Sequence, residues 1–233
     1  MIEKIYTGNT LSKVKACCGD DVWLSFQEKT KTGILTSEMC YTMFKDTKED
    51  FDFSAAVVPI MKGLELELKK VFYEPYYEYV TDNYDPKSYA QAICPSSDLE
   101  DKEKAKQVAV QKGKILYYKN GKFQFKRLST EFSIGNFRYL TTHGDKKRIE
   151  IDEIFVEFCE KKLFAEQTIA RKKIEKWVRE LIINIEPLRK LRNDSAHAGK
   201  TQNSVDAFTV ISDLIVTKKL LPVIVAPVES HYI

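Results

Sequence analysis

The chain has 233 residues and a formal net charge of +3, with 43% hydrophobic and 30% charged residues. This is the composition of a globular protein with enough chain for a sizeable core, and so small a net charge does not by itself indicate a nucleic-acid binder. Five cysteines without a CxxC pair argue against a disulfide framework or a cysteine zinc site, and the lack of an apolar run of about 18 residues argues against a membrane helix.

The expected organisation is one domain with two short flanks. We expect an N-terminal segment over 1–22, a single helical domain over 23–222 and a C-terminal tail over 223–233. The first residues, Met1-Ile2-Glu3-Lys4, lack the apolar region of a secretory signal. Together with reduced thiols, this predicts a cytoplasmic protein.

The first part of the expected domain is helical. Residues Trp23 to Phe44 offer apolar faces, with Thr32-Gly33 as the candidate interruption, and Ser54 is a candidate N-cap for a stronger helix. Tyrosines follow this helix, which either ends near Pro75 or continues with a kink; we expect these rings in or near the core. The apolar stripe at helical spacing is Val57, Val58, Met61, Leu64, Leu68, Val71 and Phe72.

The middle of the chain predicts an insertion over about 96–130. Residues Asp98 to Lys114 are strongly charged and predict an exposed helix or a linker. Asn120-Gly121 then separates two aromatic-rich runs, Ile115 to Tyr118 and Phe123 to Phe125, and this dipeptide favours a tight two-residue β-hairpin turn. Residues Phe132 to Leu140 predict a short packing element.

Helices resume at Ile151 to Phe164 and at Ala170 to Ile185. Pro187 is expected to break or kink the second of them, so that Leu188 to Ala198 forms a separate short helix that Gly199 ends. Ser204 is expected to cap a last helix over Val205 to Leu220, with Pro222 beyond its end. The apolar stripe of the second helix is Ile174, Trp177, Val178, Leu181 and Ile182.

The candidate functional motif is Arg192-Asn193-Asp194-Ser195-Ala196-His197. Arginine is a permanent cation that grips phosphate in a planar fork, and histidine exchanges protons near neutral pH, so the two together can cleave RNA without a metal. On spacing alone, a helix end with Arg192 solvated and His197 capping the last carbonyls is the simpler interpretation. The charge distribution favours a site, because residues 161–200 carry eleven basic and five acidic residues, whereas residues 1–60 carry seven basic and nine acidic ones.

The spacing of the motif sets a geometric condition. Five residues along an ideal helix turn by about 500°, so the side chains of Arg192 and His197 would point about 140° apart. One shared site therefore requires the helix to loosen or end between them, for which Asp194-Ser195 and Gly199 are the candidates. The alternative is that a second copy of the chain completes the site across a two-fold interface.

The chain resembles the HEPN superfamily of helical-bundle proteins over Trp23 to Pro222. The specific match is Arg192-Asn193-x-x-x-His197, and its setting is similar as well: a long helix, the motif, Ala198-Gly199 and a closing helix. The helix over Phe53 to Leu68 is similar to the first helix of HEPN relatives in phage defence, and the segment over Phe132 to Phe137 is similar to a glycine-containing segment between the HEPN helices. The resemblance implies a mainly α fold, a HEPN-like helical bundle with a small β-hairpin insertion.

The resemblance also implies a function, that of a metal-independent endoribonuclease with no cofactor. Many HEPN proteins are toxins of toxin–antitoxin pairs, abortive-infection proteins or antiviral effectors, and they commonly dimerise so that two Arg-His motifs face one cleft. The expected partners are accordingly RNA, a second copy of the chain, and an antitoxin or another defence protein. Acidic pairs that could hold Mg²⁺, Asp50/Asp52 and Asp152/Glu153, are interpreted as solvated helix starts.

Individual roles follow from the matched positions. Arg192 would bind the scissile phosphate, and His197 would act as general acid or base, which yields a 2′,3′-cyclic phosphate. Asn193 would orient His197 or bond a phosphate oxygen, and Asp194 would either hold one tautomer of His197 or cap the local backbone. The residues expected to add phosphate binding are Arg189, Lys190 and Lys200.

One position departs from a HEPN subgroup. Members that pair with nucleotidyltransferase antitoxins carry a modified tyrosine two residues after the histidine, whereas this chain has Gly199 there, which argues against that modification. The alternative function is a non-catalytic HEPN-like module that binds RNA or dimerises and partners another defence enzyme. A plain helical interaction protein is the third and least favoured interpretation.

Overall fold

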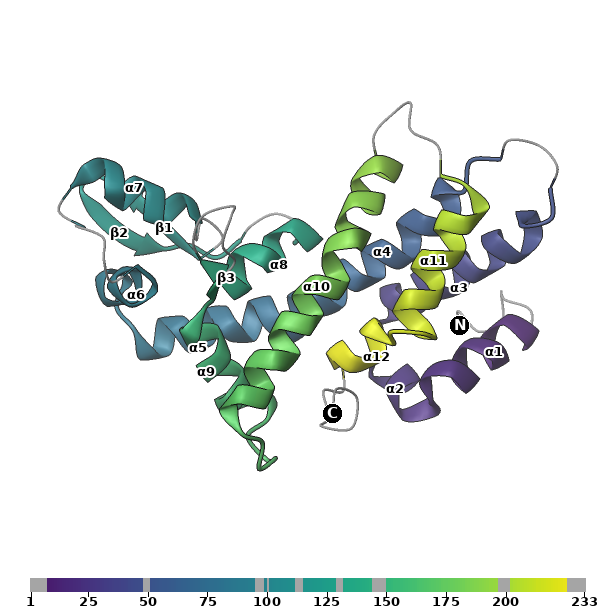
Figure 1. The fold of residues 1–233 in the computed structure, drawn as a ribbon, viewed down its shortest axis with the longest axis horizontal. Coiled ribbons are helices and arrows are strands. Elements are labelled where there is room, and N and C mark those ends of the chain that lie inside the picture. Colours follow the sequence, from purple (N-terminus) through teal and green to yellow (C-terminus); the bar gives the residue numbers. More distant parts are fainter. Residues whose placement is uncertain are drawn as a thin grey trace. The chain divides into compact units, whose positions relative to one another are not determined.

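The computed structural model describes residues 8–47, 51–94, 99, 101–111, 115–128, 132–143, 150–196 and 202–225. The protein is mainly helical, with a small two-stranded hairpin, as the sequence predicts (Figure 1). Its residues group into two compact units. Unit 1 contains the described residues of Met1–Leu68 and Ile183–His231, and unit 2 contains those of Lys69–Ile182, so the expected domain over 23–222 includes parts of both.

Unit 1 is built around two long helices that lie side by side, α3 (Glu28–Phe44) and α4 (Ser54–Leu68) (Figure 1). Small residues let them approach closely: a Cβ atom added to Gly33 would overlap the backbone carbonyl of Pro59, with only 3.0 Å between that Cβ and the carbonyl carbon. The hydroxyl of Ser37 accepts a hydrogen bond from the backbone N–H of Ile60 at 3.1 Å. The expectation that Thr32-Gly33 interrupts the helix is therefore wrong; Gly33 lies inside α3 as a packing position.

The interruption lies earlier, between α2 (Asp20–Ser25) and α3. The backbone N–H of Gln27 donates to Glu67 Oε1 at 2.8 Å, and Gln27 Nε2 donates to the carbonyl of Leu66 at 2.9 Å. These bonds tie the start of α3 to the end of α4 and satisfy a donor that the first turn of a helix leaves unpaired. The remaining helices of unit 1 are α1 (Gly8–Cys18), the end of α10 (Arg171–Ala196), α11 (Ser204–Ile215) and α12 (Leu220–Val225).

Helix α4 begins with a different cap from the one expected. Ser54 is its first residue, but the cap is supplied by Asp52, whose Oδ1 accepts from the backbone N–H of Ser54 at 3.0 Å and from its hydroxyl at 2.7 Å. Most of the predicted apolar stripe of α4 is buried, whereas Val58 is 37% exposed. The stripe also holds two buried carboxylates, Glu65 and Glu67.

The C-terminal helices differ from the expectation in three places. Pro187 does not end the helix, because α10 continues through it to Ala196; Ile185 and Leu188 remain buried around it, so the apolar stripe holds the helix in place although proline removes one hydrogen bond. The cap of α11 is Asn203 rather than Ser204, in a capping box with Asp206. The last expected helix is two helices, and Pro222 lies inside α12.

Unit 2 has an aromatic core. The chain passes through a π-helical segment, Lys69–Tyr73, into α5 (Glu74–Asn83), so the helix continues with Pro75 in its first turn. The rings of Phe137, Phe155 and Trp177 lie 5.2 to 6.0 Å from that of Phe72 between centroids. As expected for the tyrosine run, Tyr73, Tyr76 and Tyr79 are buried. The predicted stripe over Ile174 to Ile182 is buried as well.

Unit 2 continues with α6 (Pro86–Ile93), α7 (Lys102–Gln111) and the hairpin of β1 (Leu116–Lys119) and β2 (Lys122–Phe125), of which α7 and the hairpin lie in the segment over about 96–130. The turn is the predicted Asn120-Gly121, with φ of 53° and 77°, the positive values that this turn type requires. β1 packs beside α7, and β2 beside α6.

The rest of unit 2 comes between the hairpin and α10 in the sequence. It consists of α8 (Ile134–Thr141), the short strand pair β3 (Thr142–His143) and β4 (Glu150–Ile151), and α9 (Glu153–Phe158), which runs into a second π-helical segment, Cys159–Leu163. α8 corresponds to the predicted packing element over Phe132 to Leu140. Asp152 caps α9 by accepting from the backbone N–H groups of Ile154 and Phe155.

Candidate functional site

Arg192 lies near the end of α10 and forms an ion pair with a buried acid. Its Nε atom is 3.3 Å from Oε1 of Glu65 on α4, and the two side chains are 30% and 3% exposed. Within the described part of the chain, this is the ion pair that Arg192 forms. The guanidinium therefore has one edge turned to a protein carboxylate, while part of the Arg192 side chain remains exposed.

Glu65 is held by a second cation. Its Oε2 atom lies 3.3 Å from Nζ of Lys62, one turn earlier on α4, and the Lys62 side chain is 42% exposed. A buried carboxylate between two half-exposed cations leaves the three side chains with a net charge of +1. A buried acid that fixes the orientation of an arginine prepares it to meet a second anion.

The other predicted site residues are unevenly placed. Asn193 is half-buried, and Lys190 is exposed. Arg189 is engaged by Glu186 through two hydrogen bonds of 3.0 and 2.6 Å, so its fork is already occupied by a carboxylate. Asp194 lies within the helical backbone of α10, whereas the predictions for the side chain of Asp194 and for His197 and Lys200 fall outside what the structure describes.

The helix does not loosen at Asp194-Ser195, since α10 remains helical to Ala196. From Arg192 to Ala196, each residue is therefore rotated from the one before it by about 100° around the helix axis. A loosened helix at Asp194-Ser195 is thus excluded as the way to bring the Arg192 and His197 side chains of one chain together.

Gln202, five residues after His197 in the sequence, is held by backbone hydrogen bonds at the start of α4. The backbone N–H of Gln202 donates to Asp52 Oδ1 at 3.1 Å, and its carbonyl accepts from the backbone N–H of Phe53 at 3.0 Å. The hydrogen bonds of Asp52, first of all the one from the backbone N–H of Ser54, lower the pKa of this carboxyl below its ordinary value. The start of α4 thus anchors the backbone at Gln202, and later turns of the same helix carry Lys62 and Glu65.

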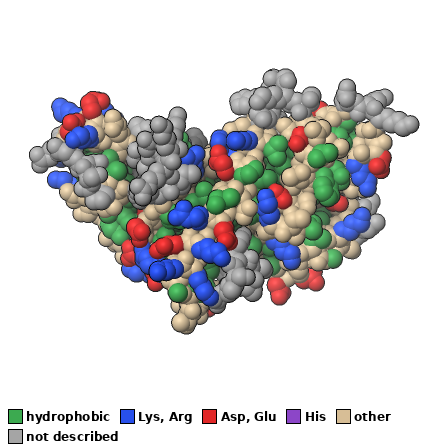
Figure 2. All heavy atoms as spheres, viewed as in Figure 1, with side chains coloured by type: hydrophobic (Ala, Val, Ile, Leu, Met, Phe, Trp, Pro, Cys, Tyr) green, Lys and Arg blue, Asp and Glu red, His purple; other side chains and the backbone are tan. Residues whose placement is uncertain are grey.

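Within the described part of the chain, five of the eleven basic residues in the window over 161–200 are paired with acids. On the face drawn in Figure 2, Lys and Arg side chains are interspersed with Asp and Glu side chains and do not form one continuous basic surface. The pairing acids come from inside and outside the window; the exposed pairs contribute little to stability, whereas the pair of Arg192 has a buried carboxylate. The pairs are Lys161 with Glu157, Arg171 with Glu153, Glu160 and Glu175, Lys176 with Glu180, Arg189 with Glu186, and Arg192 with Glu65.

No metal site emerges from the described residues, which contain no cluster of three or more His, Cys, Asp or Glu side chains placed to hold an ion. Asp52 and Asp152, the acids considered for Mg²⁺, cap α4 and α9 instead. None of the helices in the described part of the chain combines the length and apolar character needed to cross a membrane.

The residues missed from the sequence are Glu65 and Lys62. One signal was present: Leu64-Glu65-Leu66-Glu67-Leu68 places acids within an apolar helical stripe, and carboxylates are almost never fully buried unless they are paired. The sequence could indicate that these acids need cations but could not name Arg192.

Comparison with protein-family models, with curated proteins and with solved structures gave no match.

Proposed function

We propose that the protein is a metal-independent endoribonuclease whose site combines Arg192 with His197. The observation that carries the proposal is the ion pair of Arg192 with the buried Glu65. It fixes the direction of the guanidinium while leaving 30% of the side chain exposed. Because the resemblance is to HEPN toxins and abortive-infection proteins, the proposed role is that of a toxin or an antiviral effector.

The chemistry divides between two side chains. The guanidinium would bind a non-bridging oxygen of the scissile phosphate and stabilise the charge that develops in the transition state. The imidazole of His197 would remove the proton of the ribose 2′-hydroxyl or protonate the leaving 5′-oxygen. Attack of the 2′-oxygen on phosphorus breaks the bond to the 5′-oxygen and leaves a 2′,3′-cyclic phosphate and a 5′-hydroxyl. Asn193 would orient the imidazole or bond a phosphate oxygen.

The proposed enzyme is a dimer. The backbone is helical from Arg192 to Ala196, and a fifth step of the same rotation would point His197 about 140° from Arg192, which favours a site made by Arg192 of one copy and His197 of another. Unit 1 also exposes two large apolar side chains at i and i+3 of α11, Val205 at 69% and Phe208 at 55%. We propose that the second copy covers them.

The test is cleavage of a 5′-labelled RNA by the purified protein in the presence of EDTA. Arg192→Lys and His197→Ala are expected to lose cleavage; the lysine keeps a charge for Glu65 but lacks the planar fork. Arg179→Ala is the matched control, because Arg179 is exposed on the same helix and forms no ion pair with a described residue. Equal cleavage by all four proteins, or cleavage only with added Mg²⁺, would refute the proposal.

One observation favours a second candidate, a non-catalytic RNA-binding or dimerisation module. Both arginines near the end of the motif helix, Arg189 and Arg192, are already paired with glutamates, and a paired arginine can be structural. In that case the protein would bind RNA, or form a dimer, without cleaving RNA in the same assay.

A further inference from the structure

The β1–β2 hairpin of unit 2 combines cations with aromatic rings. Residues 115–128 contain four cations, Lys119, Lys122, Lys126 and Arg127, and no Asp or Glu. The same stretch contains Tyr117, Tyr118, Phe123 and Phe125. Such a mixture of cations and π-faces is the combination with which proteins bind single-stranded nucleic acid.

The strand register places these side chains in pairs. Tyr118 lies opposite Phe123, with their ring centroids 5.0 Å apart in an edge-to-face arrangement. Next to the turn, Lys119 lies opposite Lys122. Like charges directly opposite each other destabilise a hairpin, and within the described residues neither lysine has an acidic partner. An anion at this tip would remove the repulsion.

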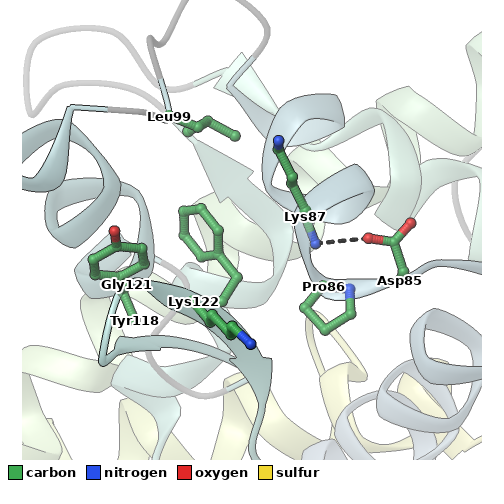
Figure 3. A pocket seen from close by; sticks show the side chains of 8 residues that line it. Asp85, Pro86, Lys87, Leu99, Tyr118, Gly121 and Lys122 are labelled. Carbon is green, nitrogen blue, oxygen red and sulfur yellow. Dashed lines mark hydrogen bonds between the residues drawn. The ribbon is translucent and has the colours of Figure 1, made fainter.

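A cavity of about 390 Å³ lies beside this tip. It is lined by Tyr118, Phe123 and Lys122 of the hairpin and by Asp85, Pro86 and Lys87 at the start of α6, and Figure 3 shows Tyr118 and both lysines around it. Its volume is within the range of small-ligand pockets.

Asp85 is the acid in this lining, and its carboxylate is already used. It caps α6 by accepting from the backbone N–H groups of Lys87 and Ser88, at 2.9 and 3.1 Å, and from the Ser88 hydroxyl. The hydrogen bond from that hydroxyl is the main reason that the pKa of Asp85 lies below its ordinary value. The ammonium groups of Lys87 and Lys122, by contrast, form no ion pair with a described residue, so the pocket offers two cations beside its rings that no described acid neutralises.

We propose that this pocket binds a nucleobase together with its adjacent phosphate, and that its occupant is single-stranded nucleic acid. The base would stack against Tyr118 and Phe123, and the phosphates would meet Lys87, Lys122 and Lys119. An acidic peptide would satisfy the lysines but would leave the rings without a flat partner, which is why nucleic acid is favoured. The site lies wholly in unit 2 and does not depend on the chemistry of Arg192 and His197.

The test measures binding of a fluorescent 2′-O-methyl octamer to the 233-residue chain by anisotropy at several salt concentrations. This strand has no free 2′-hydroxyl, so it cannot be cleaved by the proposed route, and the result is independent of nuclease activity. Lys87→Gln/Lys122→Gln should reduce the slope of log affinity against log salt by about 1.4, since each phosphate neutralised on a single strand contributes about 0.7. Tyr118→Leu, which keeps an apolar side chain, should weaken binding at least about five-fold.

Lys29→Gln is the matched control, because Lys29 is an exposed lysine of α3 in unit 1 and should bind like the wild type. Adenosine monophosphate as competitor distinguishes the two sources of this chemistry: displacement only at much higher concentration than the octamer supports a strand, and equal potency identifies a free nucleotide in the same pocket. Wild-type affinity in both variants, no binding by the wild type, or equally potent displacement by polyglutamate would overturn the proposal.

Discussion

The ion pair of Arg192 with Glu65 makes an asymmetric prediction about stability. The Glu65 side chain is 3% exposed, whereas Arg192 is 30% and Lys62 42% exposed. If the acid is removed, both cations can be solvated where they are. If the arginine is removed, a buried carboxylate remains with Lys62 alone. Arg192→Met should therefore destabilise the protein more than Glu65→Gln, because an uncompensated buried charge is costly.

The size of the effect follows from the distance. At 3.3 Å, the attraction between two unit charges is about 5 kcal/mol for an effective dielectric constant of about 20. Desolvation offsets part of it, and Lys62 retains part of the compensation. We expect losses of about 2.5 kcal/mol for Arg192→Met and about 1 kcal/mol for Glu65→Gln, and only about 1.5 kcal/mol for the double variant, which corresponds to a coupling of about 2 kcal/mol.

The assay is a double-mutant cycle by urea unfolding at neutral pH, with the slope against urea compared across the four proteins. Equal slopes would show that the denatured states are comparable. A coupling below about 0.5 kcal/mol, or a greater loss in Glu65→Gln than in Arg192→Met, would refute the argument that Arg192 compensates a buried charge.

Three further predictions concern the fold. Gly33→Ala should cost about 1–3 kcal/mol and lower the thermal midpoint, since its Cβ would meet the Pro59 carbonyl; an unchanged midpoint would contradict this. The pKa of Asp52 is lowered on folding, so its contribution to the free energy of unfolding is complete above about pH 4 and is lost as pH falls through the folded pKa. Between about pH 5 and about pH 2.5, urea unfolding should therefore show a smaller decrease in the free energy of unfolding for Asp52→Asn than for the wild type. Gly121→Ala should cost about 1 kcal/mol by chemical denaturation because φ is 77°, and a neutral result would argue against this turn.

Local chemistry determined several elements before any contact was known. Asn120-Gly121 predicted the hairpin because few other dipeptides adopt positive φ at both positions, and those values are found. The apolar spacing over Ile174 to Ile182 predicted a buried helical face because that period is a property of the α-helix itself, and the face is buried. The mainly helical class of the protein rests on signals of this kind.

Tertiary contacts decided what local rules could not. Proline predicts a break at Pro187, yet Ile185 and Leu188 are buried on either side of it and α10 continues, because the burial of a whole helical face outweighs one lost hydrogen bond. Gly33 predicted an interruption because glycine adopts many backbone conformations and so weakens a helix. The structure shows instead that Gly33 makes room for the backbone of Pro59 on the neighbouring helix.

The candidate site divides in the same way. The sequence by itself identified the Arg192–His197 motif, since an arginine and a histidine in a fixed order are a local pattern. Only the tertiary structure joined Arg192 to Glu65 and Lys62 and anchored Gln202 at the start of α4. These contacts join segments far apart in the chain. Residue type and local spacing do not determine which helix a side chain will contact in the folded protein.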